Sequence, residues 1–136
     1  MKRLPALRPM WLAVAAAALA AGCATPPPPP APPGLAEVLE RPAERALLAG
    51  IRAYDDGQYA QAEKALRRAL SEGLASPRDR ATAHKLLAFI SCTSDRPADC
   101  EKQFRDARAA DASFALSRSE AGHPLWGPVY KSLATP

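Results

Sequence analysis

The sequence predicts an all-α domain that follows an export signal and a proline-rich tether. Three observations lead to this fold class. Apolar residues recur at helical spacing from Pro42 onward, short breaks rich in Asp, Gly and Pro divide the pattern into helix-length segments, and no strand pattern is evident. We therefore expect a signal peptide at residues 1–22, a tether at 23–41 and a helical domain at 42–136.

The first 22 residues have the three parts of an export signal. Lys2, Arg3 and Arg8 supply positive charge, the stretch from Met10 to Ala21 is apolar, and small residues precede Cys23. The apolar stretch has 12 residues, whereas a bilayer-spanning helix needs roughly 20, so it does not predict a permanent membrane span.

The segment Leu19-Ala20-Ala21-Gly22-Cys23 resembles the lipobox of bacterial lipoproteins, with Ala20 where that motif usually has Leu. The resemblance implies that Cys23 becomes the lipid-bearing first residue of the mature protein. The two or three acyl chains expected there would anchor it firmly. Ala24 is not the Asp of inner-membrane retention, which implies the periplasmic face of the outer membrane. Simple secretion with cleavage elsewhere is the alternative.

Charge argues against a nucleic-acid partner. Three of the 18 Lys and Arg residues lie in the predicted signal, so 15 remain against 14 Asp and Glu residues. A mature chain so close to neutral lacks the basic surplus that attracts phosphate backbones.

Residues 26–34 are almost entirely proline and predict an extended spacer. Proline fixes φ and lacks a backbone donor, so this segment cannot form a helix or sheet interior. In the polyproline II conformation, at about 3.1 Å per residue, it would reach roughly 30 Å. We expect it to hold the domain clear of the membrane. A ligand for a proline-reading domain is the alternative.

Four helices are expected after the tether. The first begins at Pro42 and ends at the break Asp55 to Gln58, and the second ends at Gly73 to Pro77. A third runs from near Arg78 to Ser94, and the fourth follows Pro97. The positions at helical spacing are Ala46, Leu47, Gly50, Ile51 and Tyr54; Tyr59, Ala62, Leu66, Ala69 and Leu70; His84, Leu87, Ala88 and Phe89; and Cys100, Phe104 and Ala107.

Two sets of these positions resemble the tetratricopeptide repeat, which pairs two antiparallel helices. The resemblance implies two hairpins in which small residues let the helix axes approach and larger ones fill the space between. Ala46 and Ala49 depart from the pattern, and an unrelated helical bundle is the alternative. The matching residues are Gly50, Tyr59, Ala62, Leu66 and Ala69, and then Leu87, Ala88, Cys100, Phe104 and Ala107, 38 residues later.

The C-terminal stretch predicts a capping helix, which such short arrays need. Ser117 to Glu120 has capping-box spacing, and Pro128 is acceptable in a first helical turn. We expect a fifth helix of roughly two turns, with Trp126, Val129, Tyr130 and Leu133 on one side. The alternative is a partner-binding aromatic plug of His123, Trp126 and Tyr130.

Cys92 and Cys100 predict a disulfide. They lie four residues on either side of Arg96, at the centre of a helix turn, and positions equidistant from such a turn face each other. An even number of cysteines in an oxidising compartment favours the bond over two buried thiols, the alternative. Two cysteines without further ligands at suitable spacing do not predict a metal site.

The sequence offers little support for catalysis. His84 lies where repeat helices would pack, His123 lies in a turn, and no glycine-rich phosphate loop follows a strand. We therefore expect no enzyme, and no cofactor other than the covalent lipid on Cys23.

The repeat resemblance implies a concave face that is lined by the first helix of each hairpin. An apolar strip with a few charges suits a peptide or helix from a partner protein. Residues 34–40 or the last helix could instead cover the strip. The partner-binding candidates are Glu44, Leu47, Ile51, Tyr54, Asp55, Lys85 and Phe89, with Trp126 and Tyr130 from the C-terminal stretch.

Residues 84–92 and 121–130 resemble lipoproteins associated with bacterial type VI secretion, the TssQ family. Gly-His-Pro and Trp-Gly-Pro in the second stretch are the more distinctive. The resemblance implies an accessory, non-catalytic lipoprotein with a protein partner, attached to the membrane through its lipid, without a nucleic-acid or small-molecule partner. A general envelope-assembly or pilotin-like lipoprotein is the alternative.

Overall fold

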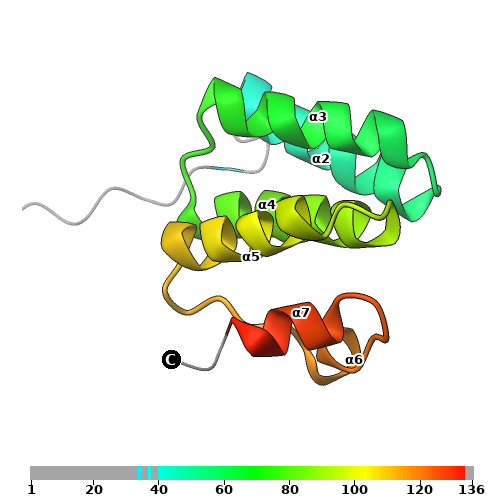
Figure 1. Cartoon of the computed structure of the whole chain (residues 1–136). Coiled ribbons are helices and arrows are strands. Elements are labelled where there is room, and N and C mark those ends of the chain that lie inside the picture. Colours follow the sequence, from blue (N-terminus) through cyan, green and yellow to red (C-terminus); the bar gives the residue numbers. More distant parts are fainter. Residues whose placement is uncertain (1–33, 35–36, 38–39, 134–136) are drawn as a thin grey trace, which may run out of the picture. The chain divides into compact units, whose positions relative to one another are not determined.

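The computed structural model describes residues 34, 37 and 40–133, whose regular elements are all α-helices, joined by turns and irregular segments (Figure 1). The all-α prediction is confirmed. The predicted signal peptide, Cys23 and nearly all of the tether lie outside the described residues. The helices are α2 (Pro42–Asp55), α3 (Tyr59–Glu72), α4 (Pro77–Thr93), α5 (Pro97–Ala110), α6 (Arg118–Ala121) and α7 (Gly127–Ser132).

The first hairpin joins α2 and α3 through a tight turn. Pro42 lies in the first turn of α2, and Gly57, with φ of 72°, takes the left-handed conformation that favours glycine. Gly50 brings the two helices close, because a Cβ there would lie 2.8 Å from Leu66 Cγ. Leu66 is fully buried with its small neighbours Ala62 and Ala69, as predicted, whereas Tyr59, expected on the same face, is 48% exposed.

The second hairpin joins α4 and α5 in the same way. The Ser76 hydroxyl accepts a hydrogen bond from the Asp79 N–H at 3.3 Å, and Pro77 follows at the first helical position. The helix thus begins one residue before the expected Arg78. Asp95, with φ of 56°, turns the chain into α5. The buried residues between these helices include the predicted Leu87, Ala88, Cys100, Phe104 and Ala107.

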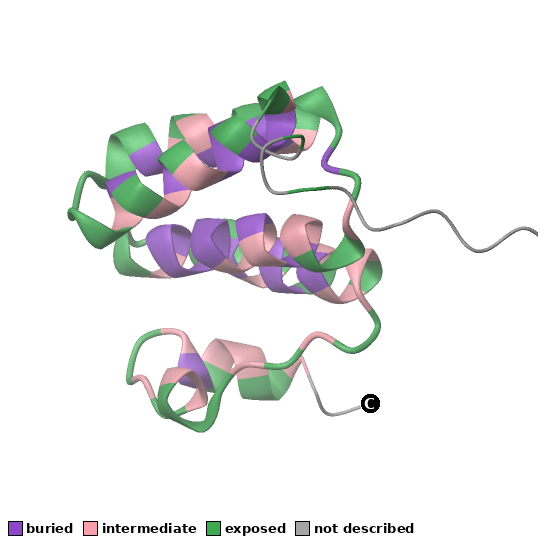
Figure 2. Cartoon of the chain, turned by 180° about the vertical axis from the view of Figure 1, so that it is seen from behind, coloured by how far each residue is buried: buried purple, intermediate pink, exposed green. Residues whose placement is uncertain are grey.

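The two hairpins pack as layers, with α3 against α4 (Figure 1). Buried residues gather on the sides of the helices that face one another, as Figure 2 shows. An ion pair ties the layers together, because Glu63 of α3 accepts hydrogen bonds from Arg96 at 3.0 and 2.8 Å. Arg67 also donates to Glu63, at 2.7 Å.

These hydrogen bonds lower the pKa of Glu63 to about 2, since Arg96 favours the carboxylate more than burial disfavours it and Arg67 adds to the effect. Glu63 therefore remains ionised down to strongly acidic conditions.

The C-terminal stretch corrects one expectation: it forms two short helices instead of one. The capping box at Ser117 is present, but it starts the separate one-turn helix α6, which ends at Gly122. Pro124 lacks a backbone donor and prevents that helix from continuing. α7 begins at Gly127 with Pro128 in its first turn. Its six residues are fewer than the two turns expected.

α6 and α7 form a third, smaller layer below the second hairpin (Figure 1). A Cβ at Gly127 would lie 2.6 Å from the Ala121 carbonyl oxygen, so only glycine permits this approach of α7 to α6. Tyr130 packs edge-on against Phe104 at 5.4 Å between ring centroids. Arg108 lies over the Tyr130 ring and donates to the Leu133 carbonyl at 2.6 Å. α7 thus closes the end of α5, as a cap should.

Candidate partner-binding surface

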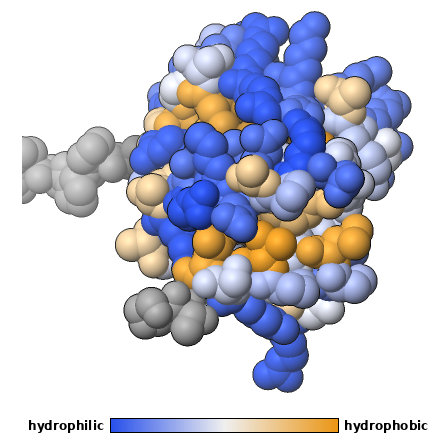
Figure 3. Space-filling model, viewed as in Figure 1, coloured by the Kyte–Doolittle hydropathy of each residue, from blue (hydrophilic) through white to orange (hydrophobic). Residues whose placement is uncertain are grey.

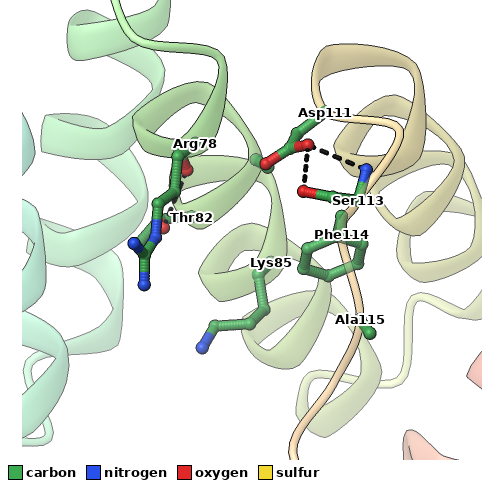
Figure 4. Close-up of a pocket in the computed structure, with 8 residues that line it drawn as sticks. Arg78, Thr82, Lys85, Asp111, Ser113, Phe114 and Ala115 are labelled. Carbon is green, nitrogen blue, oxygen red and sulfur yellow. Dashed lines mark hydrogen bonds between the residues drawn. The ribbon is translucent and has the colours of Figure 1, made fainter.

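A pocket of about 350 Å³ lies between α4 and the segment that follows α5 (Figure 4). Helical spacing places its α4 residues on one side of that helix, and the chain after α5 supplies the opposite wall. Phe114, half-buried, makes that wall partly apolar. The lining residues are Arg78, Ala81, Thr82 and Lys85 of α4, and Asp111, Ser113, Phe114 and Ala115 of the following segment.

Hydrogen bonds fix the polar groups of this pocket. The Ser113 amide and hydroxyl both donate to Asp111 Oδ1, at 2.8 and 2.6 Å, and the Thr82 hydroxyl donates to the Arg78 carbonyl at 2.9 Å (Figure 4). The two bonds from Ser113 lower the pKa of Asp111 and keep it ionised, with a smaller contribution from Arg78. The pocket therefore offers the Arg78 cation and the Asp111 carboxylate, which suits a polar peptide segment.

The third layer holds the middle of α4. Lys85 Nζ lies 2.7 Å from Glu120 Oε1, and Glu120 also accepts from the Ser117 amide at 2.8 Å. Burial acts to raise the pKa of Glu120, but the hydrogen bonds from Lys85 and Ser117 outweigh it and lower that pKa. Glu120 is thus both a helix cap and the anionic partner of Lys85.

Trp126 makes the next contact between the third layer and α4. Its ring stacks on Phe89 at 4.2 Å and on His123 at 3.3 Å between centroids, and its Nε1 donates to the Glu120 carbonyl at 2.9 Å. The sequence left open whether Trp126 and Tyr130 belong to a cap or to a partner-binding plug. In the fold both pack inward, as parts of the cap.

The predicted concave strip is only partly accessible. Glu44, Leu47 and Phe89 are buried, at 7%, 5% and 4% exposure, and Lys85 is engaged by Glu120. Its remaining members are the half-buried Ile51 and Tyr54 and the exposed Asp55. Of the two coverings that the sequence left open, the C-terminal stretch accounts for Lys85 and Phe89.

Tyr54 lies at the edge of the strip, where burial raises its pKa and the neighbouring Tyr59, Asp55 and Glu120 raise it further. Tyr59, part of the repeat resemblance, is 48% exposed and stacks obliquely on Tyr54 at 5.6 Å.

Leu125, in the turn between α6 and α7, is exposed to a similar degree as Tyr59, at 54%. On the face drawn in Figure 3, hydrophobic surface gathers in the lower half, toward the layer of α6 and α7.

Sequence reasoning missed most of the pocket. Thr82 lies one turn before Lys85 on α4 and belongs to the same helical face, a signal that could have been followed. Asp111, Ser113 and Phe114 follow the last helical position of α5, and no periodicity indicates where that segment lies. Only the folded chain brings them to Arg78.

Both histidines have structural partners. His84 Nδ1 lies 2.8 Å from Gln103 Oε1 and 4.0 Å from Asp106 Oδ2, and His123 Nδ1 accepts from the Leu125 amide at 3.2 Å. Among the residues that the structure describes, no group of His, Cys, Asp and Glu is placed to hold a metal ion. No helix in the described part of the chain has the length and apolarity to cross a membrane.

Cys92 and Cys100 lie at disulfide-bonding distance, with Cα atoms 5.2 Å apart, across the turn between α4 and α5. The spatial pairing expected from the sequence is therefore present. Cys23 lies outside the described residues, so its lipid remains an expectation.

The fold and this surface define a small stack of helical hairpins with a pocket between its second hairpin and the following segment. Compared with protein-family models, with curated proteins and with solved structures, the chain gives no match.

Proposed function

We propose that this protein is a lipid-tethered helical-repeat adaptor that mediates protein–protein contacts. The observation that carries the proposal is the pocket between α4 and residues 111–115, because separate elements of the fold supply its two walls. The exposed Arg78, the Asp111 carboxylate and the Phe114 ring can contact a partner's peptide, whereas Lys85 is already paired with Glu120. The lipid would be carried by Cys23, on the periplasmic face of the outer membrane.

We further propose that the partner belongs to a bacterial type VI secretion system. Two stretches resemble the lipoproteins of that system, residues 84–92 and 121–130. They meet in the folded chain, since Phe89 of the first stacks on Trp126 of the second. A resemblance confined to two segments gains weight when those segments form one structural unit.

A pilotin-like or general envelope-assembly lipoprotein is the alternative. The lipobox resemblance and the proline-rich tether support it equally, because both roles need a helical domain held at a membrane. The two proposals differ only in the identity of the partner.

Affinity capture from the native envelope tests the adaptor and its partner together. Ala115 is exposed and lines the pocket, so Ala115→Trp fills the pocket without replacing a core residue. Ala109→Trp, on an exposed α5 position outside the pocket, is the matched control.

Recovery of secretion-system subunits with the wild type and Ala109→Trp, and their loss with Ala115→Trp, is the expected result. Recovery of outer-membrane pore subunits instead would favour the pilotin-like role. Equal recovery with all three proteins would contradict the pocket as the contact site.

A further inference from the structure

A second surface lies along the first hairpin, where three adjoining pockets of about 310, 330 and 320 Å³ form one shallow groove. We call it the basic groove. α2 and α3 supply all of its lining residues, so it shares none with the pocket described above. Its apolar lining comes from Ala46, Ala49 and Ala65, with Leu48 and Pro42 toward the α2 side, and its cations are Arg45, Arg52, Lys64 and Arg68.

The rims hold a surplus of positive charge. Arg68 pairs with Glu72 at 2.7 Å, whereas Arg45, Arg52 and Lys64 are exposed and have no ion-pair partner among the described residues. The other carboxylates of α2 and α3 do not pair with these cations. Glu63 binds Arg67 and Arg96, Glu44 is buried, and Asp55, at the end of α2, forms no ion pair with Arg52. A nearly neutral mature chain thus concentrates unpaired cations on one groove.

The shape of the groove favours a helix over a lipid surface. Binding to a membrane needs bulky apolar side chains that protrude into the bilayer. The apolar lining here is mostly alanine methyls, and its one leucine, Leu48, is half-buried and does not protrude beyond the longer cationic side chains. Small residues in this lining instead allow another helix to approach to an interaxial distance of about 8–10 Å.

The cations are spaced to meet the two flanks of such a helix. Arg45 and Arg52 are seven residues apart on α2, about 10 Å along the axis, and Lys64 and Arg68 are one turn apart on α3. A helix with small apolar residues at i, i+3, i+4 and i+7 and carboxylates on both sides of that stripe complements this arrangement.

We propose that the basic groove binds an acidic amphipathic helix of a partner protein. The proposal adds a second contact to the adaptor and does not depend on the pocket, the lipid or the secretion system. The pocket can therefore fail its test while the groove passes, and the reverse also holds.

The test uses the mature chain from residue 23 with Cys23→Ser, and a fluorescent designed helix of about 20 residues with an Ala/Leu stripe flanked by Glu. Fluorescence anisotropy at low salt measures the dissociation constant. We expect the double variant Arg45→Glu/Arg52→Glu to weaken binding by at least about tenfold, because two attractive contacts become repulsive. Ala49→Trp should weaken it by a similar factor without changing the charge.

Arg105→Glu, at an exposed α5 position outside the groove, is the control for net charge and should bind as the wild type does within about twofold. Thermal unfolding by circular dichroism checks that each variant folds, and the altered groove residues are all exposed.

Three results would overturn the proposal. One is equal affinity for a scrambled peptide of the same composition that lacks the stripe, which would mean attraction by charge alone. The second is unchanged binding in Ala49→Trp. The third is failure of the designed helix to bind the wild type. The groove would then be the site of another occupant: anionic phospholipid vesicles, a second copy of the chain or the tether.

Discussion

Glu63 accepts hydrogen bonds from Arg67 on its own helix and from Arg96 at the turn of the next hairpin, so one carboxylate joins two layers. Its pKa is lowered from 4.5 to about 2, chiefly by Arg96. A lowered folded-state pKa stabilises the fold at any pH above the unfolded value and loses that effect as the pH falls toward the folded value.

We therefore expect Glu63→Gln to lower the free energy of unfolding by about 1 kcal/mol near neutral pH, the upper end for a partly exposed ion pair. The difference from the wild type should shrink as the pH falls from 4.5 through about 2, where the wild-type carboxyl also becomes protonated. Urea midpoints across this range measure it. Glu101→Gln, which removes an exposed pair with Arg105, is the control and should change little. A pH-independent difference would contradict the role given to the charge.

At the scale of the element, α7 depends on a single glycine. A Cβ at Gly127 would meet the Ala121 carbonyl at 2.6 Å, and a backbone atom cannot move aside as a side chain can. Gly127→Ala should therefore displace α7 and separate Trp126 from Phe89. Hydrogen exchange over residues 117–133 should accelerate at least about tenfold while α2 to α5 keep their protection.

Gly122→Ala is the matched control for α7. Its Cβ would meet nothing closer than 3.4 Å and its φ is −85°, so exchange should stay near that of the wild type. Equal protection of residues 117–133 in both variants would show that the third layer does not rely on this close approach.

The turn between α4 and α5 carries the second prediction at this scale. A bond between Cys92 and Cys100 closes a short loop and should stabilise the oxidised chain by about 2–3 kcal/mol. Intact mass without reductant should be two hydrogens below the dithiol mass, and reductant should lower the thermal midpoint. Cys92→Ser should make that midpoint insensitive to reductant. A dithiol mass from periplasmic protein would contradict the bond.

The sequence indicates the four long helices well because local signals mark both ends. Pro42, Pro77 and Pro97 occupy first turns, and the breaks at Gly57, Gly73 and Asp95 coincide with positive φ. The same signals do not determine how layers pack. The apolar Phe89 could equally face a partner or the chain itself, and only its stack on Trp126 decides between them. The pocket was missed for a related reason, since residues 111–115 have no periodic pattern.

At the scale of the whole molecule, the lipid on Cys23 remains a prediction, and it decides where the domain works. Wild-type protein should take up labelled palmitate and sediment with membranes, because two or three acyl chains bind firmly. Cys23→Ser should lose the label and pass into the soluble periplasmic fraction. Cys92→Ser, which alters a different cysteine, should stay attached. Firm membrane attachment of Cys23→Ser would rule out the lipobox interpretation.

Each layer of this protein is contiguous in sequence: α2 with α3, then α4 with α5, then α6 with α7. Contacts within a layer therefore join near neighbours along the chain, and such local contacts form quickly. A chain that leaves a narrow exit with its N-terminus first can close one hairpin before the next has emerged. Folding can then proceed one hairpin at a time as the chain emerges, and each folded hairpin provides the surface against which the next one packs.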